Sequence, residues 1–462
     1  MSDIAIEAGL MDRAMRRVAS FWRDLAGAVQ RSPAAFSDFA EEFRECLQAR
    51  GGEVSARKRA AALAERYRGL DETGKLDFLR ALAAFDSDAL AVTRAIEKLS
   101  AAPDAALRAI ALAGLRRALE PPRLRLLTAF GAIPDGVKFL VMMRADLLRL
   151  KDDEPLLQAL ETDLKGLLAS WFDVGFLELR AIDWKSPAAL LEKLVQYEAV
   201  HRIRTWRDLR NRLDSDRRCY AFFHPRMPDE PLIFVEVALE RGMAASVQKL
   251  LDEKAPVLDA GQADTAVFYS INNCQRGLDG ISFGNFLIKR VVELLAAEFP
   301  KLKTFCTLSP MPGFRAWLGK TLGAGGILLS TEEEAALATA NGGVAPDFAR
   351  LLADRAWLRQ EALSRALAPM LIRLGARYLL QESPQGRAGR TLDPVAHFHL
   401  SNGARVERLN WRADVSENGL RQSCGLMVNY LYDPASIENN HEAYVGDGQR
   451  AASGGLKRLI RA

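Results

Sequence analysis

The hydrophobic pattern of this chain changes near Phe172, and this change constrains the fold more than any other feature of the sequence. Before Phe172, apolar residues recur every three or four positions, which is the period of a helix with one buried face. After it, alternating or continuous apolar runs of strand length follow. A chain of 462 residues is also too long for one ordinary core. The sequence therefore predicts an all-α helical bundle over residues 1–172 and an α+β domain with a mixed sheet over residues 173–462.

The first half contains apolar stretches with helical spacing, separated by short breaks that contain proline or glycine. Two predicted helix faces comprise Phe36, Phe39, Phe43 and Cys46, and Leu76, Phe78, Leu79, Leu82 and Phe85. This half contains no histidine, and its arginines are scattered along the polar faces of the predicted helices. We therefore expect it to serve in packing or oligomerisation rather than in catalysis.

The second half mixes predicted strands with predicted helices. Strands are predicted at residues 219–223, 232–239, 265–271, 304–308, 396–400 and 404–411. Helical periodicity returns over residues 284–299 and 332–380. Ser330 and Glu333 fit a capping box at the start of the second of these stretches.

The bulk composition excludes several classes of protein. Apolar residues make up 49% of the chain and charged residues 26%, which is typical of a soluble globular enzyme. A formal net charge of +4 argues against a nucleic-acid-binding protein. No stretch approaches the roughly 20 apolar residues of a membrane span, and the N-terminus lacks the apolar block of a signal peptide. We therefore expect a cytoplasmic protein without a membrane or nucleic-acid partner.

The five cysteines lie far apart and include no CxxC pair. This spacing is typical neither of a zinc site nor of the disulfide framework of a secreted protein. We expect reduced thiols and no bound metal.

A strand–loop–helix segment between Phe268 and Arg290 contains three glycines, Gly277, Gly280 and Gly284. Glycine lets the backbone approach a ligand closely, and the first turn of a helix offers unpaired N–H groups to phosphate oxygens. The spacing is neither GxGxxG nor that of a P-loop, which excludes the nicotinamide and P-loop interpretations. On residue types alone, a phosphate-binding loop and a plain glycine-rich turn remain equal alternatives.

Ser309 directly follows a predicted strand and is held between rigid neighbours. Pro310 and Pro312 restrict the backbone around it to extended forms, so its hydroxyl is presented at a fixed position. An active-site hydroxyl and a simple loop serine are both compatible with this pattern. The segment lacks the GxSxG motif, which argues against the nucleophile of an α/β-hydrolase.

Two of the five histidines of the chain, His397 and His399, lie in one predicted strand. Strand alternation would place both on the same face, with Phe398 on the opposite face. Such a pair can bind a metal ion, transfer protons, or simply be packed. No third ligand stands at a supporting spacing, so proton transfer is favoured over metal binding.

Several segments, taken together and in this order, resemble the malonyl-CoA decarboxylase family. They are Phe268–Ile271, Phe286–Val292, Leu308–Pro310 with Pro312–Phe314, Phe398–Leu400 and Ser423–Met427. The resemblance implies a helical N-terminal domain used in homo-oligomer assembly, with a tetramer expected, and a catalytic domain with the GNAT acyltransferase fold. It also implies a bacterial-type cytoplasmic enzyme, because the peroxisomal ending of animal members is missing.

The same resemblance implies the activity and the site residues. The expected reaction converts malonyl-CoA to acetyl-CoA and CO2 in fatty acid and malonate metabolism, without a metal or an organic cofactor. Ser309 and His399 match the catalytic serine and histidine of the family, and Tyr432 matches its functional C-terminal tyrosine. The loop implied to hold the CoA pyrophosphate consists of Asp279, Gly280, Ile281, Ser282, Phe283, Gly284 and Asn285. Ser282 departs from the acidic residue of relatives at that position.

Two other functions remain as alternatives. One is an acyl-CoA-dependent N-acyltransferase on the same fold, which would need an amine acceptor. The other is a non-catalytic, CoA-sensing assembly protein built around the helical domain. Under the decarboxylase hypothesis, Ser309 orients the carboxylate or thioester and His399 delivers a proton to the enolate, with Tyr432 positioning one of them.

Overall fold

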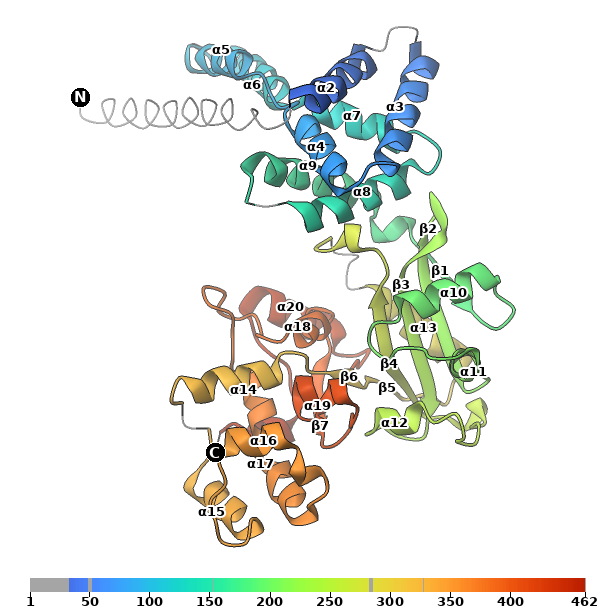
Figure 1. Cartoon of the computed structure of the whole chain (residues 1–462), viewed down its shortest axis with the longest axis vertical. Coiled ribbons are helices and arrows are strands. Elements are labelled where there is room, and N and C mark those ends of the chain that lie inside the picture. Colours follow the sequence, from blue (N-terminus) through green and yellow to red (C-terminus); the bar gives the residue numbers. More distant parts are fainter. Residues whose placement is uncertain (1–32, 49–51, 152, 282–285, 327, 462) are drawn as a thin grey trace, which may run out of the picture. The chain divides into compact units, whose positions relative to one another are not determined.

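The computed structural model describes residues 33–48, 52–151, 153–281, 286–326 and 328–461. These residues divide into two compact units (Figure 1). Unit 1 runs to Phe172 and also includes residues 275–282, and unit 2 contains the rest of the chain. The inclusion of the short segment 275–282 in the helical unit is not evident from the sequence.

Unit 1 is helical throughout its described residues. Its helices are α2 (Pro33–Gln48), α3 (Gly52–Arg68), α4 (Glu72–Ala83), α5 (Ala89–Ser100), α6 (Ala105–Leu119), α7 (Pro122–Gly131), α8 (Gly136–Leu150), α9 (Pro155–Trp171) and the 3-10 turn η4 (Arg276–Leu278). Aspartates cap α4, α5 and α6 by accepting hydrogen bonds from first-turn N–H groups.

The core of unit 1 is an aromatic cluster. Phe78 lies at its centre and makes edge contacts with Phe39, Phe43 and Tyr67 at ring-centroid distances of 4.9–5.2 Å. The two predicted helix faces supply most of this core: Phe39, Phe43, Cys46, Phe78, Leu79 and Leu82 are buried, whereas Leu76 and Phe85 are half-buried. Helical periodicity therefore identified the buried faces of α2 and α4 correctly.

The hairpin of α5 and α6 differs from the other helices of unit 1. Neither helix contains a buried residue, although the two pack on each other. Several large apolar side chains are exposed, including Leu90 at 67% and Ile110 at 68%. These exposed apolar side chains are therefore not used for packing within the described part of the unit.

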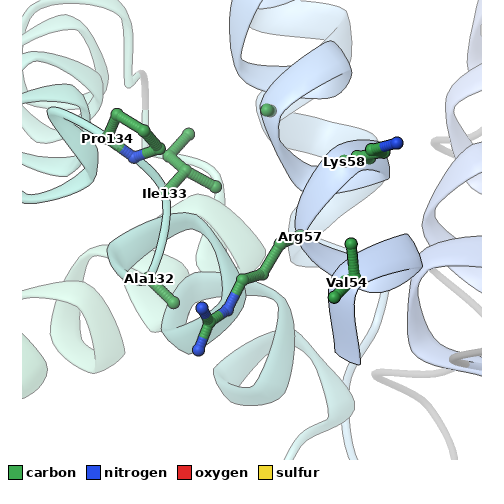
Figure 2. Close-up of a pocket in the computed structure, with 7 residues that line it drawn as sticks. Val54, Arg57, Lys58, Ala132, Ile133 and Pro134 are labelled. Atoms are coloured by element: carbon green, nitrogen blue, oxygen red, sulfur yellow. The ribbon is translucent and has the colours of Figure 1, made fainter. Parts of the chain in front are cut away.

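Unit 1 also contains an open pocket of about 560 Å³ between α3 and the turn that joins α7 to α8. Figure 2 shows Val54, Arg57 and Lys58 on α3, with Ala132, Ile133 and Pro134 on the turn across from them. The pocket is lined by Val54, Arg57, Lys58, Ala61, Ala132, Ile133 and Pro134. Because no acidic residue, histidine or hydroxyl lines it, we assign it no chemistry.

Unit 2 is built on a mixed sheet with the strand order β1-β2-β3-β4-β5-β8-β6, in which β7 also pairs with β8. The strands are β1 (Glu178–Ile182), β2 (Arg217–His224), β3 (Met227–Glu240), β4 (Thr265–Asn273), β5 (Thr304–Thr307), β6 (Ser309–Pro310), β7 (Arg405–Asn410) and β8 (Met427–Leu431). Strands β1 to β4 are antiparallel, β4 and β5 are parallel, and β8 is antiparallel to β5, β6 and β7. The predicted order of a helical domain followed by a mixed-sheet domain is confirmed.

Unit 2 also contains helices and short 3-10 turns. They are η2 (Val174–Phe176), α10 (Ala188–Tyr197), α11 (Trp206–Arg212), α12 (Val247–Leu250), η3 (Ala260–Gln262), α13 (Phe286–Glu298), α14 (Phe314–Gly323), α15 (Thr331–Ala340), α16 (Phe348–Asp354), η5 (Ala356–Leu358), α17 (Glu361–Leu380), α18 (Pro394–Ser401), α19 (Glu417–Ser423), α20 (Ile437–Asp447) and α21 (Gly454–Leu459). Apolar side chains of α10 and α11 pack with those of β2 in one buried cluster. The predicted capping box at Ser330 and Glu333 is present at the start of α15.

Ser309 lies just beyond the point where strands β4 and β5 stop pairing with each other. Their parallel pairing ends at Phe268 and Thr307, and after Leu308 the chain forms β6, whose Ser309 and Pro310 pair with β8. The register between β3 and β4 also shifts at this level, between Glu236 and Val237. Such irregularities bend strands apart and are common beside active sites.

One sequence-based prediction of an element is wrong. Residues 396–400 do not form a strand but lie in helix α18, which begins with Asp393 as N-cap and Pro394 in its first turn. Both residue types are typical helix-start signals, and they outweigh the strand-like composition of the segment. The stretch 332–380 is largely helical, as predicted, and is divided among α15, α16, η5 and α17.

Candidate active site

The structure brings Ser309, His399 and Tyr432 together. His399 Nε2 lies 3.0 Å from Ser309 Oγ, and His399 Nδ1 lies 2.8 Å from the Tyr432 hydroxyl oxygen. The three residues come from β6, from α18 and from the end of β8, and all three are buried. They therefore form one continuous hydrogen-bonded series within unit 2.

Thr307 extends this series beyond the serine. The Ser309 hydroxyl donates to Thr307 Oγ1 at 2.8 Å, and the Tyr430 backbone N–H donates to the same oxygen at 3.1 Å. With its own proton directed to Thr307, Ser309 Oγ accepts a hydrogen bond from the other side, where His399 Nε2 lies. Thr307 was not among the residues singled out in the sequence, where it appears only as one hydroxyl within an apolar strand.

The surroundings of His399 favour its neutral form. Burial lowers the pKa of His399 to about 3, because the charged imidazolium would lose its hydration. Burial also raises the pKa of Tyr432 well above its ordinary value, so that this residue keeps its proton. A neutral imidazole that accepts from Tyr432 at Nδ1 carries its proton on Nε2, directed to Ser309.

The ring of His399 is further fixed by Tyr430. The two rings stack at a centroid distance of 4.4 Å and an interplanar angle of 24°. Tyr430 lies on β8 and Tyr432 directly follows this strand, and the side chains of both contact the imidazole. These two residues thus hold the imidazole through one ring contact and one hydrogen bond.

His397 does not join the series. On a helix, residues two positions apart are separated by about 200° of rotation, so the expectation that His397 and His399 share a face is wrong. His397 Nδ1 instead lies 2.8 Å from the hydroxyl oxygen of Tyr444. The two histidines therefore have separate tyrosine partners, and only His399 is beside Ser309.

The loop implied to bind CoA is described only in part. Asp279, Gly280 and Ile281 belong to the described residues of unit 1, whereas Ser282, Phe283, Gly284 and Asn285 lie outside them. Gly280 has a φ of +72°, a left-handed conformation that favours glycine.

Arg144, on α8, fixes the start of this loop. Its guanidinium donates to the carbonyl oxygens of Gly277 at 2.7 Å and of Asp279 at 2.9 Å. It also forms an ion pair with Glu161 at 2.6 Å. Arg144 is only 1% exposed, so these hydrogen bonds are shielded from water. A Cβ at Gly277 would lie 1.8 Å from the Val141 carbonyl oxygen, and therefore only glycine fits there.

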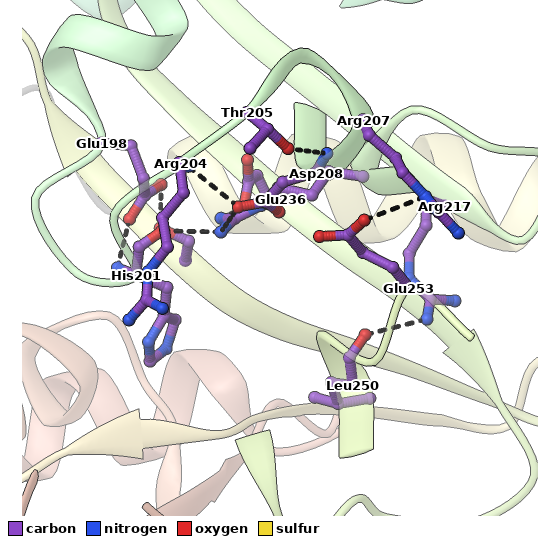
Figure 3. A network of polar contacts seen from close by, with 12 residues as sticks. Glu198, His201, Arg204, Thr205, Arg207, Asp208, Arg217, Glu236, Leu250 and Glu253 are labelled. Carbon is purple, nitrogen blue, oxygen red and sulfur yellow. Dashed lines mark hydrogen bonds and ion pairs between the residues drawn. The ribbon is translucent and has the colours of Figure 1, made fainter. Parts of the chain in front are cut away.

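Unit 2 also contains a buried charged network that the sequence analysis missed. Figure 3 shows it between the 198–208 segment and β3. Arg212 donates to Glu236 at 3.0 Å, to Asp208 at 2.9 Å and to the His201 carbonyl oxygen at 2.7 Å. The available signal was Glu236 itself, a single carboxylate within the apolar run of residues 232–239.

Glu198 is the second buried carboxylate of this network. It accepts hydrogen bonds from the Ser270 hydroxyl at 2.7 Å and from the Asn272 amide at 2.8 Å, both on β4. Burial raises the pKa of Glu198, and burial also raises the pKa of Glu236 to about 8. The network therefore joins the loop before α11 to the middle of the sheet.

A cluster of metal-binding side chains is missing from the described residues. No group of three or more histidine, cysteine, aspartate or glutamate side chains in that part of the chain could hold a metal ion. The five cysteines are all free and buried. Within the same residues, no helix is long and apolar enough to cross a membrane.

Comparison with known proteins identifies the family. The family described as Malonyl-CoA decarboxylase C-terminal domain matches residues 175–462, and its N-terminal counterpart matches residues 85–172. Mitochondrial malonyl-CoA decarboxylase of Mus musculus is 39% identical over 359 residues, which cover 75% of this chain and 72% of that protein. The enzyme of Anser anser anser is 38% identical over 352 residues, covering 73% and 69%.

Solved structures lead to the same family. The crystal structure of malonyl-CoA decarboxylase from Rhodopseudomonas palustris is 44% identical, with a TM-score of 0.82, and covers 92% of this chain and 99% of that one. The enzyme from Agrobacterium vitis has 43% identity, the same TM-score and the same coverage. The resemblance inferred from the ordered sequence segments is thus confirmed. This chain belongs to the malonyl-CoA decarboxylase family.

Proposed function

We propose that this chain is a carboxy-lyase that converts malonyl-CoA to acetyl-CoA and CO2. Membership of the family, supported by matches in both domains, indicates the substrate and the reaction. The structural observation that carries the proposal is the series Tyr432–His399–Ser309 at hydrogen-bond distances. It joins a proton-carrying imidazole to a fixed hydroxyl, which are the two groups that the reaction needs.

The reaction breaks the bond between the carboxylate carbon and C2 of the malonyl group. The electron pair of this bond moves into the thioester carbonyl, which gives CO2 and a thioester enolate. Protonation at C2 then yields acetyl-CoA, so each turnover consumes one proton. Because the thioester accepts the electron pair, we propose that no metal or organic cofactor takes part, and coenzyme A is part of the substrate.

Ser309 and His399 have separate roles in this proposal. Ser309 hydrogen-bonds the carboxylate or the thioester oxygen and orients the breaking bond perpendicular to the thioester plane. When the substrate is bound, His399 takes up a proton from solvent and becomes an imidazolium. It then delivers its Nε2 proton to C2 and returns to the neutral form, so that each turnover consumes one proton from solvent. A bound substrate carboxylate raises the pKa of a nearby histidine, because the negative charge stabilises the imidazolium form. His399 can therefore keep the added proton until the enolate forms. Tyr432 fixes the orientation of the ring through Nδ1.

The direct test is incubation of the purified protein with malonyl-CoA alone in the presence of a chelator, with acetyl-CoA and CO2 both measured. Equal amounts of the two products, unaffected by the chelator, are expected. Absence of CO2 would overturn the proposal. Acyl transfer to an added amine without CO2 release would indicate an N-acyltransferase instead, and CoA binding without either product would indicate a sensing protein.

A matched pair of variants tests the role of His399. His399→Asn should abolish turnover, because the amide cannot supply the proton, while binding of CoA remains nearly intact. His397→Asn is the control, because it makes the same change on the same helix but acts on the residue paired with Tyr444. Wild-type turnover in His399→Asn would contradict the assignment.

The CoA-binding loop remains a proposal as well. We propose that residues 279–285 hold the CoA pyrophosphate through backbone N–H groups at the start of α13. The support is the position of this loop between a strand and a helix and the left-handed φ of Gly280. Gly280→Val should raise the KM for malonyl-CoA with little change in kcat, and an unchanged KM would contradict the proposal.

We further propose that the protein forms a homo-oligomer, with a tetramer expected from the family resemblance. The support in the structure is the α5–α6 hairpin, which leaves large apolar side chains exposed. Exposed apolar side chains that gather on one element are typical of surfaces that bind another protein.

We also propose that the enzyme works in the cytoplasm, in fatty acid and malonate metabolism. The five free, buried cysteines support a reducing compartment, because secreted proteins tend to pair their cysteines. Cell fractionation with detection of the protein is the test. Recovery outside the cytoplasmic fraction would contradict the proposed location.

A further inference from the structure

The carboxylate of Asp393 connects two segments that each carry one member of the proposed catalytic pair. Its Oδ1 accepts hydrogen bonds from the backbone N–H groups of Val395 and Ala396, each at 2.9 Å. Its Oδ2 accepts a hydrogen bond from the Tyr378 hydroxyl at 3.2 Å, and the Gly313 backbone N–H also donates to the carboxylate. Asp393 is fully buried, so these donors take the place of water.

The first of the two segments is helix α18. Asp393 is its N-cap, and His399 lies six positions later in the same short helix. The two N–H groups bound by Oδ1 belong to the first turn, where the backbone otherwise lacks partners. Asp393 therefore fixes the position and direction of the helix that carries the imidazole.

The second segment is the loop that follows Ser309. Gly313 lies four positions after Ser309, and Pro310 and Pro312 stand between them. Each proline fixes its own φ, so the loop transmits a displacement of one end to the other. Holding Gly313 therefore also restricts where the Ser309 hydroxyl lies.

Tyr378, on α17, also binds the Asp393 carboxylate, and its side chain fills the space beside Gly313. A Cβ at Gly313 would lie 2.3 Å from the Tyr378 hydroxyl oxygen, so a side chain there would displace the tyrosine from Asp393. The Tyr378 ring also packs on Phe314 at 5.7 Å between centroids. The carboxylate is thus enclosed by the loop, by α17 and by the start of α18.

We infer that Asp393 is a positioning residue of the reaction, which sets the separation between Ser309 Oγ and His399 Nε2 by joining the Ser309 loop to α18. The inference rests on the proposed function, because it assigns Asp393 a role in the same site. A displacement of about 1 Å between reacting groups can lower a rate about 100-fold. Asp393 acts only through the two residues it positions, since its hydrogen-bond partners are Tyr378, Gly313 and the first turn of α18.

The test begins with Asp393→Asn. The amide oxygen still accepts from the first turn of α18, whereas the amide NH2 group faces the Gly313 N–H and cannot accept from it. We expect kcat for CO2 release to fall by roughly 10- to 100-fold while the KM for malonyl-CoA stays within about twofold. The control is Asp347→Asn, which makes the same change at the exposed N-cap of α16, and both of its kinetic constants should be unchanged.

A second variant changes Tyr378, which donates a hydrogen bond to Asp393. Tyr378→Phe keeps the ring but removes the hydroxyl that donates to Asp393. It should lower kcat in the same direction as Asp393→Asn but by a smaller factor, again with KM nearly unchanged. If Asp393→Asn does not fold, Tyr378→Phe becomes the deciding variant. An unchanged kcat in Tyr378→Phe would then overturn the inference.

A double-mutant cycle with Ser309→Ala separates positioning from general destabilisation. If Asp393 acts by holding Ser309 against His399, Asp393→Asn should lower kcat much less in the Ser309→Ala background. A full multiplicative loss in that background, or an unchanged kcat in Asp393→Asn itself, would overturn the inference. A wild-type enzyme that releases no CO2 would instead refute the proposed function, so the two failures are distinguishable.

Discussion

The buried environment of His399 makes the stability of the protein depend on the protonation state of this residue. Burial lowers the pKa of this histidine to about 3 in the folded protein, whereas an unfolded chain titrates near 6.5. Between these two values the unfolded chain binds a proton that the folded protein does not. The free energy of unfolding therefore falls as the pH is lowered from 6.5 towards 3.

This linkage gives the first prediction. His399→Asn removes the titrating group, so its free energy of unfolding should depend on pH less steeply than that of the wild type below pH 6.5. The difference in slope should approach roughly 1.4 kcal/mol per pH unit. Urea denaturation at several pH values measures both slopes, and equal slopes would show that His399 is not the buried neutral group described above.

The second prediction concerns Tyr432. Tyr432→Phe removes the hydroxyl 2.8 Å from His399 Nδ1 and leaves a buried ring nitrogen without that partner. We expect kcat to fall roughly tenfold or more, with a smaller change in KM, because the imidazole loses the hydrogen bond that fixes its orientation. Tyr444→Phe is the control, since it removes the equivalent hydroxyl from His397 and should leave kcat nearly unchanged. Equal losses in the two variants would contradict a specific role for Tyr432.

At the level of single residues, sequence reasoning identified the groups with distinctive chemistry. Ser309 was marked by its prolines, and the pair His397 and His399 by the scarcity of histidine. The family resemblance, not the residue pattern, selected His399 of the two. The residues that position Ser309 and His399 were missed. Thr307 appears in the sequence as a single hydroxyl within an apolar strand, and Asp393 reaches the Ser309 loop through a contact with Gly313 that lies far from it in the chain. The Asp393-Pro394 pair did carry a signal, since this dipeptide is a typical helix start.

At the level of elements, the hydrophobic period of a strand can be distinguished from that of a helix only in longer segments. Helix α18 has eight residues and was predicted as a strand, because its aromatic and branched residues suit both structures. The long apolar runs of β3 and β4 and the repeated faces of α2 and α4 were predicted correctly. Short elements are fixed by their caps and their tertiary contacts, which a periodicity argument does not contain.

The third prediction belongs to helix α8 of unit 1. Arg144→Ala leaves Glu161 and the carbonyl oxygens of Gly277 and Asp279 without their buried donor. Removing one partner of a buried ion pair costs about 3–5 kcal/mol, so the free energy of unfolding should fall by that order. Chemical denaturation of the full chain is the measurement.

Arg149→Ala is the matched control for this variant. Arg149 lies on the same helix but pairs with Glu72 and Asp146 at the surface. Exposed ion pairs contribute little to stability, so the unfolding midpoint of this variant should remain close to that of the wild type. Similar losses in the two arginine variants would contradict the special position of Arg144.

At the scale of the whole molecule, the sequence indicated the order of a helical region and a mixed-sheet region, because their hydrophobic periods differ. It did not indicate that residues 275–282 group with the helices of unit 1. That grouping depends on the Arg144 hydrogen bonds and on the close approach of Gly277 to Val141, which join positions more than 130 residues apart. Contacts of this separation leave no periodic signal in a single sequence.

The last prediction tests self-association of the whole protein. Ile110→Asp places a charge on the exposed apolar surface of the α5–α6 hairpin, where the side chain is 68% exposed. Because the residue packs little within its own chain, folding should be unaffected, whereas burial of the new charge between copies would be costly. Sedimentation should therefore show a smaller assembly than the wild type at equal concentration. Val445→Asp, at a site 62% exposed on α20, is the matched control and should sediment as the wild type does. An Ile110→Asp variant with the wild-type mass would exclude this hairpin as the contact between copies.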